Sequence, residues 1–180
     1  MMIPQISREL IARFGEKGGL LFDPYCGTGT SLVEARIASM DAIGTDINPT
    51  ARMIANSKTF DYNLEKLQTC VFKFLADIEE NLGTITDYSE FTEPEYVAWE
   101  RLEDWFPTRS IAEISYALKL IKNEKYAAGR MFLRVALSEC LRLVSYQRNG
   151  EFKLYRIPSE KRDDFYEALL PKIKARIQRN

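Results

Sequence analysis

Apolar positions along the chain follow two spacings, and these spacings predict its elements. Short apolar stretches at Leu20–Phe22 and at residues 41–46 are typical of buried strands. Elsewhere apolar residues recur every three or four positions, which predicts helices over residues 4–14, 31–38, 49–58, 64–82, 96–106, 111–121, 131–145 and 160–177. The pattern therefore predicts an α/β fold with few parallel strands and a mainly helical second half.

The change of pattern near residue 60 divides the chain into two regions. Residues 1–60 hold the predicted β–α–β region, and residues 61–180 hold most of the predicted helices. A chain of 180 residues is long enough for one domain whose core buries about 70% of the unfolded surface. We therefore expect both regions to belong to the same compact domain.

Cysteine and histidine usage excludes some classes of site. Cys26, Cys70 and Cys140 fit neither a zinc pattern nor an even set of disulfides, and the chain contains no His. We therefore expect no metal ion and a reducing compartment. No apolar stretch approaches the roughly 18 residues of a membrane span, and no basic region followed by an apolar one opens the chain. These features predict a cytoplasmic protein without a membrane partner.

Charge is unevenly distributed along a chain whose formal net charge is −1. Residues 1–60 hold 6 basic and 6 acidic side chains, residues 61–120 hold 5 and 13, and residues 121–180 hold 14 and 7. A basic last third is typical of a surface that contacts nucleic acid. Solvated helix surfaces also collect Lys and Arg, so that plainer interpretation stays open.

One segment of the basic third has a specific pattern near residues 146–156. Asn149-Gly150 is a strong hairpin-turn signal. In the flanking arms the basic residues Arg148, Lys153 and Arg156 alternate with aromatic ones, which suits phosphate contact and base stacking. The three basic residues are therefore candidate DNA contacts. An ordinary hairpin packed by its own aromatic residues shows the same alternation.

The segment between the first strand and the next helix carries the main candidate site. Gly27 and Gly29 have no Cβ, so a ligand can approach the backbone of this turn closely. A dinucleotide fingerprint would carry a third glycine, which is missing here. Asp23 stands at the strand end, where its charge repels phosphate and favours a ligand with an ammonium group, such as the methionine half of S-adenosylmethionine.

A second carboxylate follows the second predicted strand. Asp46 lies 23 positions after Asp23, close to the offset of about 20 residues at which β–α–β nucleoside sites place an acid on the ribose hydroxyls. The two aspartates together predict a nucleoside-type ligand at this end of the strands.

These residues resemble a known family. Asp-Pro-Tyr-Cys-Gly-Thr-Gly-Thr from Asp23, followed by Ala-Ile-Gly-Thr-Asp-Ile-Asn-Pro-Thr-Ala from Ala42, is similar to the cofactor half of the amino-group DNA methyltransferases, which make N6-methyladenine or N4-methylcytosine. Residues 3–11 resemble the short helix before the cofactor loop. The resemblance covers residues 3–59 and implies a partial Rossmann-like methyltransferase core, DNA as substrate and a role in restriction-modification.

The resemblance also implies a role for single residues. Asp23, Tyr25, Gly27 and Gly29 would cradle the methionine and sulfonium end of S-adenosylmethionine. The remaining cofactor contacts that it implies are Pro24, Thr28 and Thr30 in the same loop, Asp46 at the ribose hydroxyls, Ile47 beside the adenine ring and Ser7 at the methionine carboxylate.

The family's catalytic motif, an Asp-, Asn- or Ser-Pro-Pro followed by an aromatic residue, is absent from this sequence. We therefore assign no catalytic residue and expect a cofactor-binding half. A second polypeptide with the motif, or another copy of the chain, would meet the open edge of Leu20–Phe22. A truncated or decayed enzyme, a guanine-modifying RNA methyltransferase that shares the Asp-Pro-x-Cys-Gly-x-Gly-Thr pattern, and a non-catalytic binding subunit are the alternatives.

Overall fold

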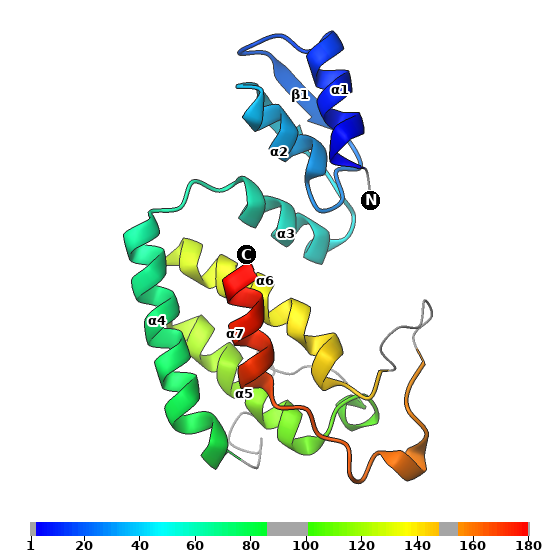
Figure 1. Ribbon diagram of the computed structural model, residues 1–180, viewed down its shortest axis with the longest axis vertical. Helices are drawn as coiled ribbons and strands as arrows, with labels where there is room; N and C mark the ends of the chain where they lie inside the picture. The colour runs from blue at the N-terminus through cyan, green and yellow to red at the C-terminus, as the bar shows by residue number, and fades with distance from the viewer. Residues whose placement is uncertain (1–2, 86–100, 148–154, 180) are drawn as a thin grey trace. The chain divides into compact units, whose positions relative to one another are not determined.

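The chain folds into two compact units, Met1–Tyr62 and Asn63–Asn180. A computed structural model describes residues 3–85, 101–147 and 155–179 (Figure 1). The division lies two residues from the boundary predicted at residue 60. The buried apolar residues form two clusters that share no member, one in each unit, and the membership of both units in one domain stays a prediction.

Unit 1 is the predicted β–α–β region. Its elements are α1 (Pro4–Phe14), β1 (Leu20–Asp23), α2 (Thr30–Ile37), β2 (Asp41–Gly44) and α3 (Pro49–Thr59). Among the described residues β1 and β2 form a parallel two-stranded sheet, in register from Leu20 opposite Asp41 to Asp23 opposite Gly44. The prediction of an α/β fold with few parallel strands is confirmed.

Only one face of this sheet is covered. Because side chains alternate along a strand, Leu21 and Ala42 point to the same face, where they pack on Cys26, Leu32 and Ala55. The opposite face carries apolar side chains that remain exposed: Leu20 at 61%, Phe22 at 61% and Ile43 at 53%. Unit 1 therefore presents a strip of apolar sheet to its surroundings.

The helix ends of unit 1 follow the sequence. Asn48 caps α3, since its side-chain oxygen accepts hydrogen bonds from the amides of Thr50 and Ala51, and Pro49 occupies the first turn. Pro4 similarly begins α1. The apolar stripe predicted on α1 is largely exposed, and Ser7 is the buried residue of that helix.

Unit 2 is helical. Its elements are α4 (Leu64–Asn81), the 3₁₀-helices η1 (Leu82–Thr84) and η3 (Leu102–Asp104), α5 (Thr108–Asn123), α6 (Ala127–Leu141), the 3₁₀-helices η4 (Arg142–Val144) and η5 (Ser159–Lys161), and α7 (Leu169–Arg179). Helix α5 is buried along most of its length and packs with α4, α6 and α7 (Figure 1). The shared core is centred on Ile78, Ile121, Leu133, Leu169 and Ile173.

Several predicted boundaries in unit 2 are wrong. Helix α6 begins at Ala127 instead of residue 131 and ends at Leu141. The described part of the helix predicted over 96–106 is only the short η3. The helix predicted over 160–177 begins at Leu169, because Pro171 lacks an amide hydrogen and is tolerated only in a first turn.

The structure describes the base of the predicted hairpin, where its two arms meet. Gln147 and Arg156 form an isolated antiparallel bridge, and the Ile157 amide donates to the Tyr146 carbonyl over 2.8 Å. The turn at Asn149-Gly150 lies outside the described residues.

Two classes of feature are absent from the part of the chain that the structure describes. None of its helices is long and apolar enough to cross a lipid bilayer. It also contains no group of three or more Cys, Asp or Glu side chains placed to hold a metal ion.

Candidate functional site

Asp23 organises the loop that joins β1 to α2. One of its carboxylate oxygens, Oδ1, accepts a hydrogen bond from the Tyr25 amide over 3.0 Å. The other, Oδ2, accepts from the hydroxyl of Ser31, the second residue of α2. The carboxylate thus fixes the beginning of the loop to the beginning of the helix.

The two glycines of the loop, Gly27 and Gly29, have different structural roles. Both have positive φ, +52° at Gly27 and +81° at Gly29, a region that favours glycine. A Cβ on Gly29 would lie 2.8 Å from the Cβ of Ala55, so this glycine lets the loop pack against α3. A Cβ on Gly27 would meet nothing within 4 Å. Gly27 therefore leaves its backbone open to a ligand.

The segment after β2 is tied to the same loop. Thr45 continues the strand pairing, because its amide donates to the Asp23 carbonyl over 3.0 Å and its carbonyl accepts from the Cys26 amide over 2.9 Å. The Thr45 hydroxyl donates to the Pro24 carbonyl over 2.8 Å. Both loops therefore meet at the carboxyl ends of the two parallel strands, the end at which open α/β sheets bind ligands.

Asp46 braces the loop from this second segment. Its Oδ2 accepts a hydrogen bond from the Gly27 amide over 2.9 Å, and its Oδ1 accepts from the Asn48 amide over 2.8 Å. Asp23 lines the hollow beside the loop, and Asp46 does not.

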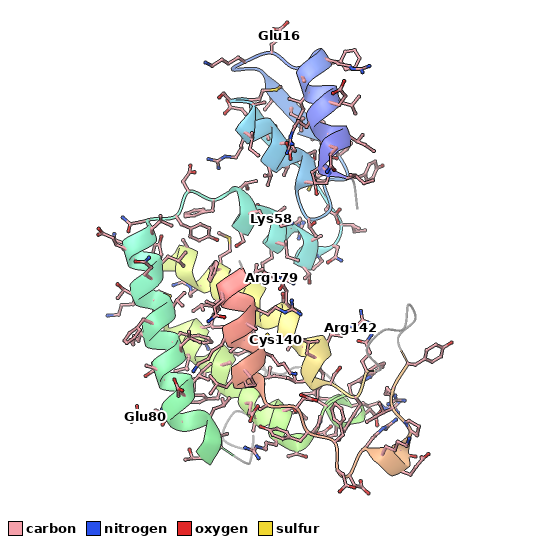
Figure 2. All side chains as sticks on the ribbon, in the orientation of Figure 1. Glu16, Lys58, Glu80, Cys140, Arg142 and Arg179 are labelled. Carbon is pink, nitrogen blue, oxygen red and sulfur yellow. The ribbon has the colours of Figure 1, made fainter. Side chains whose placement is uncertain are left out.

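That hollow is a cavity of about 400 Å³ in unit 1. Five of the predicted residues line it: Asp23, Tyr25, Gly27, Thr28 and Thr30. Lys58 of α3, labelled in Figure 2, donates to the Thr28 hydroxyl over 3.5 Å. These five residues of the predicted loop therefore line one cavity.

Two lining residues were missed as site residues, Cys26 and Ser31. The position of Ser31 in the first turn of the helix after the loop was the available signal, because such side chains reach back to the preceding strand end. Burial of the Cys26 thiol raises its pKa, and the negative charges of Asp23 and Asp46 raise it further. These shifts disfavour the thiolate, the form in which a cysteine acts as a nucleophile.

The predicted residues that do not line the cavity are Ser7, Pro24, Gly29, Asp46 and Ile47. Ile47 is 97% exposed and Tyr25 is 87% exposed, so both offer apolar surface at the carboxyl end of the sheet. Gly29 is the residue before α2 and donates its amide to the Cys26 carbonyl over 2.8 Å. Ser7 is buried on α1 and does not line the cavity.

Helix α1 is held on α2 by a two-bonded ion pair. The Arg8 guanidinium donates to both carboxylate oxygens of Glu34, over 2.9 and 3.0 Å. These hydrogen bonds hold the pKa of Glu34 below its usual value.

A second hollow of about 490 Å³ in unit 1 lies near the opposite end of the sheet and includes Arg36, Asp41 and Thr59. The Arg36 side chain is already engaged with the Thr59 carbonyl and with Asp61. Because this second hollow lies at the amino end of β2, it is a poorer candidate for a ligand site than the cavity beside the glycine loop.

The candidate DNA contacts fall in unit 2. The Arg156 guanidinium donates to the Asp104 carbonyl over 3.0 Å and lies 5.0 Å from the centre of the Trp105 ring. Arg156 is therefore engaged within the unit. Arg148 and Lys153 lie outside the described residues.

Curated relatives of the chain are Type II methyltransferases. The chain is 32% identical to Type II methyltransferase M.MvaI of Kocuria varians over its whole length and over 40% of that protein. It is 33% identical to M.MjaII of Methanocaldococcus jannaschii over 45% of the chain and 16% of the relative. It is 25% identical to M.BsoBI of Geobacillus stearothermophilus over 87% of the chain and 30% of the relative.

The chain spans less than half the length of each of these relatives. No protein-family model matches it. No solved structure matches it either. The matches agree with the motifs of the glycine loop and of the segment after β2, and the chain belongs to the amino-group DNA methyltransferase family, of whose members it represents a part.

Proposed function

We propose that unit 1 binds S-adenosylmethionine, and that the chain is the cofactor-binding portion of a DNA methyltransferase acting on the exocyclic amine of adenine (N6) or cytosine (N4). One observation carries the proposal. Asp23 and Asp46 stand at the carboxyl ends of two parallel strands, on either side of a glycine loop whose backbone is open at Gly27.

The residues of the cavity fit the methionine half of this cofactor. Asp23 supplies a negative charge for an ammonium group and is held in place by the Tyr25 amide and the Ser31 hydroxyl. The loop has no lysine or arginine of its own, unlike a site built for phosphates. Its chemistry therefore suits a cationic ligand.

The nucleoside half would lie along the segment after β2. Asp46 already accepts two amide hydrogen bonds, and a carboxylate offers about four acceptor positions. It therefore retains capacity for two ribose hydroxyls. The exposed side chains of Ile47 and Tyr25 provide apolar surface for a purine ring.

The bound cofactor would supply a methyl group on a sulfonium centre, and the described residues of unit 1 would bind and orient it. The sequence contains no Pro-Pro-aromatic motif, the motif with which the family holds the target base. We therefore propose that catalysis needs a second polypeptide. Its docking surface would be β1 and the exposed face of Leu20, Phe22 and Ile43; self-association there is the alternative.

Two other functions remain as alternatives. A guanine-modifying RNA methyltransferase is favoured by the shared Asp-Pro-x-Cys-Gly-x-Gly-Thr pattern. A non-catalytic subunit that holds cofactor or DNA for a partner is favoured by the missing motif.

Titration calorimetry tests the cofactor assignment. Wild-type chain should bind S-adenosylmethionine and its demethylated product, and should not bind NAD. Asp23→Asn keeps the shape of the side chain, removes its charge and should weaken binding of the cofactor at least tenfold. Absence of S-adenosylmethionine binding by the folded wild-type chain would overturn the proposal.

A further inference from the structure

Unit 2 contains a cavity of about 550 Å³ that plays no part in the cofactor site. It lies where the first turns of α4, the end of α5 and the start of α6 come together. Three of its lining residues are lysines: Lys66, Lys73 and Lys125. Lys66 and Lys73 are seven residues apart on α4, a spacing that places both on one side of the helix.

The lysines of this cavity differ from the cations of the basic last helix. On α7, Lys172 pairs with Glu167 and Lys174 with Glu79, each over 3.0 Å. Arg179, labelled in Figure 2, pairs with Glu139 over 2.6 Å. Among the described residues no ion pair or hydrogen bond neutralises the side chains of the three cavity lysines. The cavity lysines are therefore available to bind an anion, whereas several cations of α7 are already paired with glutamates.

The two carboxylates of the cavity, Glu65 and Glu124, offset part of this charge, so that three lysines against two glutamates leave a net formal charge of +1 on the lining. Glu124 Oε1 accepts from the Tyr126 amide over 2.8 Å, and the Glu124 carboxylate also accepts a hydrogen bond from the Cys70 thiol. Burial and Glu124 raise the pKa of Cys70 to about 11, so the thiol adds no negative charge at neutral pH. Glu65 lies exposed in the first turn of α4, where a carboxylate is favoured by the helix dipole.

The cavity also contains an uncharged hydrogen-bond donor, the hydroxyl of Tyr126. The Tyr126 hydroxyl accepts a hydrogen bond from the Asn63 amide over 3.3 Å, and its own hydrogen remains available to an acceptor. The hollow thus holds three ammonium groups and a hydroxyl donor beside two carboxylates, and its net positive charge favours an oxyanion ligand.

We infer that this cavity binds the phosphate backbone of double-stranded DNA, with Lys66, Lys73 and Lys125 as the contacting residues. The choice of DNA over another phosphodiester rests on the proposed function. Phosphate contacts by lysine position a protein on the duplex without reading its sequence. The cavity would therefore contribute salt-dependent affinity that is independent of the target site.

The test compares salt dependence of duplex binding in two triple variants of the full chain. Lys66→Gln/Lys73→Gln/Lys125→Gln removes the cavity lysines. Lys17→Gln/Arg134→Gln/Lys161→Gln removes the same amount of charge from exposed positions elsewhere. Fluorescence anisotropy with a labelled 20-base-pair duplex would give the slope of log K against log salt. We expect the cavity variant to lose about 2–3 units of slope and the control variant less than 1, at about 0.9 units per phosphate contact.

Each outcome separates the inference from the proposed function. Equal slope losses in both variants, or wild-type chain that binds cofactor and no duplex, would overturn the inference and leave the cofactor proposal standing. Displacement of the duplex by micromolar AMP or inorganic phosphate would reassign the cavity to small phosphates and overturn the DNA assignment. Calorimetry with S-adenosylmethionine on both variants should show unchanged affinity, and circular dichroism should show unchanged helix content, which checks that unit 2 folds.

Discussion

The carboxylate of Asp46 accepts a hydrogen bond from the amide of Gly27 over a distance of 2.9 Å. This bond joins the open turn of the glycine loop to the segment that follows the second strand. The aspartate that the family resemblance places at the ribose therefore also shapes the loop that we propose for the methionine end. A substitution at position 46 should therefore disturb both the glycine loop and the proposed ribose contact.

Replacing Asp46 tests this double role. Asp46→Ala removes the acceptor of the Gly27 amide and the proposed partner of the ribose hydroxyls, and should weaken S-adenosylmethionine binding by about 1–3 kcal/mol. Asp41→Ala, an exposed aspartate at the other end of β2, is the matched control and should leave affinity unchanged. Titration calorimetry measures both, and equal affinities for wild type and Asp46→Ala would remove Asp46 from the site.

A pair of glycine variants separates backbone strain from close packing. Gly18 and Gly29 have similar φ values of +77° and +81°, but only Gly29 faces a neighbour, Ala55. Gly18→Ala should cost about 1–2 kcal/mol of local stability, the penalty of left-handed backbone. Gly29→Ala should cost about 2–4 kcal/mol, since overpacking adds to that penalty.

Hydrogen exchange of the β1 and β2 amides measures this difference inside unit 1, without assuming that the whole chain unfolds in one step. Equal losses of protection in the two variants would show that the contact between Gly29 and Ala55 carries no energy.

The sequence was most informative where one short segment determined both structure and chemistry. Asn48 and Pro49 fixed the start of α3, and the glycines and Asp23 fixed the loop, because capping and positive φ are local requirements. Asp46 was found by its spacing from Asp23. Its hydrogen bond to Gly27 was not, since it depends on how the two strand ends meet in space.

Features that depend on packing between distant segments were not predictable. Pro171 limits the start of α7 locally, but the contact that holds this start is distant: the Glu113 carboxylate of α5 accepts from the Leu169 amide over 2.9 Å, 56 residues away. The apolar periodicity of α1 predicted burial, yet Ile6 and Phe14 are exposed. Periodicity indicates which side of a helix is apolar, and what covers that side is a separate matter.

Glu113 also makes the stability of unit 2 depend on alkaline pH. Burial and the hydrogen bond to Glu113 raise the pKa of Tyr166 to about 12, above the value of about 10 in an unfolded chain. Between these values the unfolded chain loses the Tyr166 proton first, so this contribution is full below pH 10 and is lost as pH rises toward 12.

We therefore expect the unfolding free energy to fall by about 1–3 kcal/mol more in wild type than in Tyr166→Phe over pH 10–12. Urea denaturation of both proteins at several pH values gives the comparison, and the other tyrosines and the cysteines are common to both. Parallel pH profiles would show that Tyr166 titrates as it does in the unfolded chain.

The hairpin near residues 146–156 remains a candidate DNA contact, and salt dependence tests it. Replacing Arg148, Lys153 and Arg156 together by Gln should reduce the slope of log K against log salt by up to about 3 units. Arg156→Gln alone should change the slope little, because its guanidinium already contacts Asp104 and Trp105. An unchanged slope in the triple variant would indicate a hairpin that serves packing only.

The chain alone should transfer no methyl group, because its proposed cofactor cavity is only one of the two surfaces that must meet at the reacting nitrogen. Holding both reactants in position can supply about 7–11 kcal/mol of a barrier, and this sequence has no base-gripping motif to hold the second one. A companion with that motif should dock along β1, cover exposed residues such as Phe22, and restore transfer. A tritiated-methyl assay on DNA compares the purified chain with and without the product of the adjacent gene, and Phe22→Asp should abolish the gain from the companion while leaving cofactor affinity intact. Strong incorporation by the 180-residue chain alone would show that it contains a catalytic element of its own and would end the half-enzyme proposal.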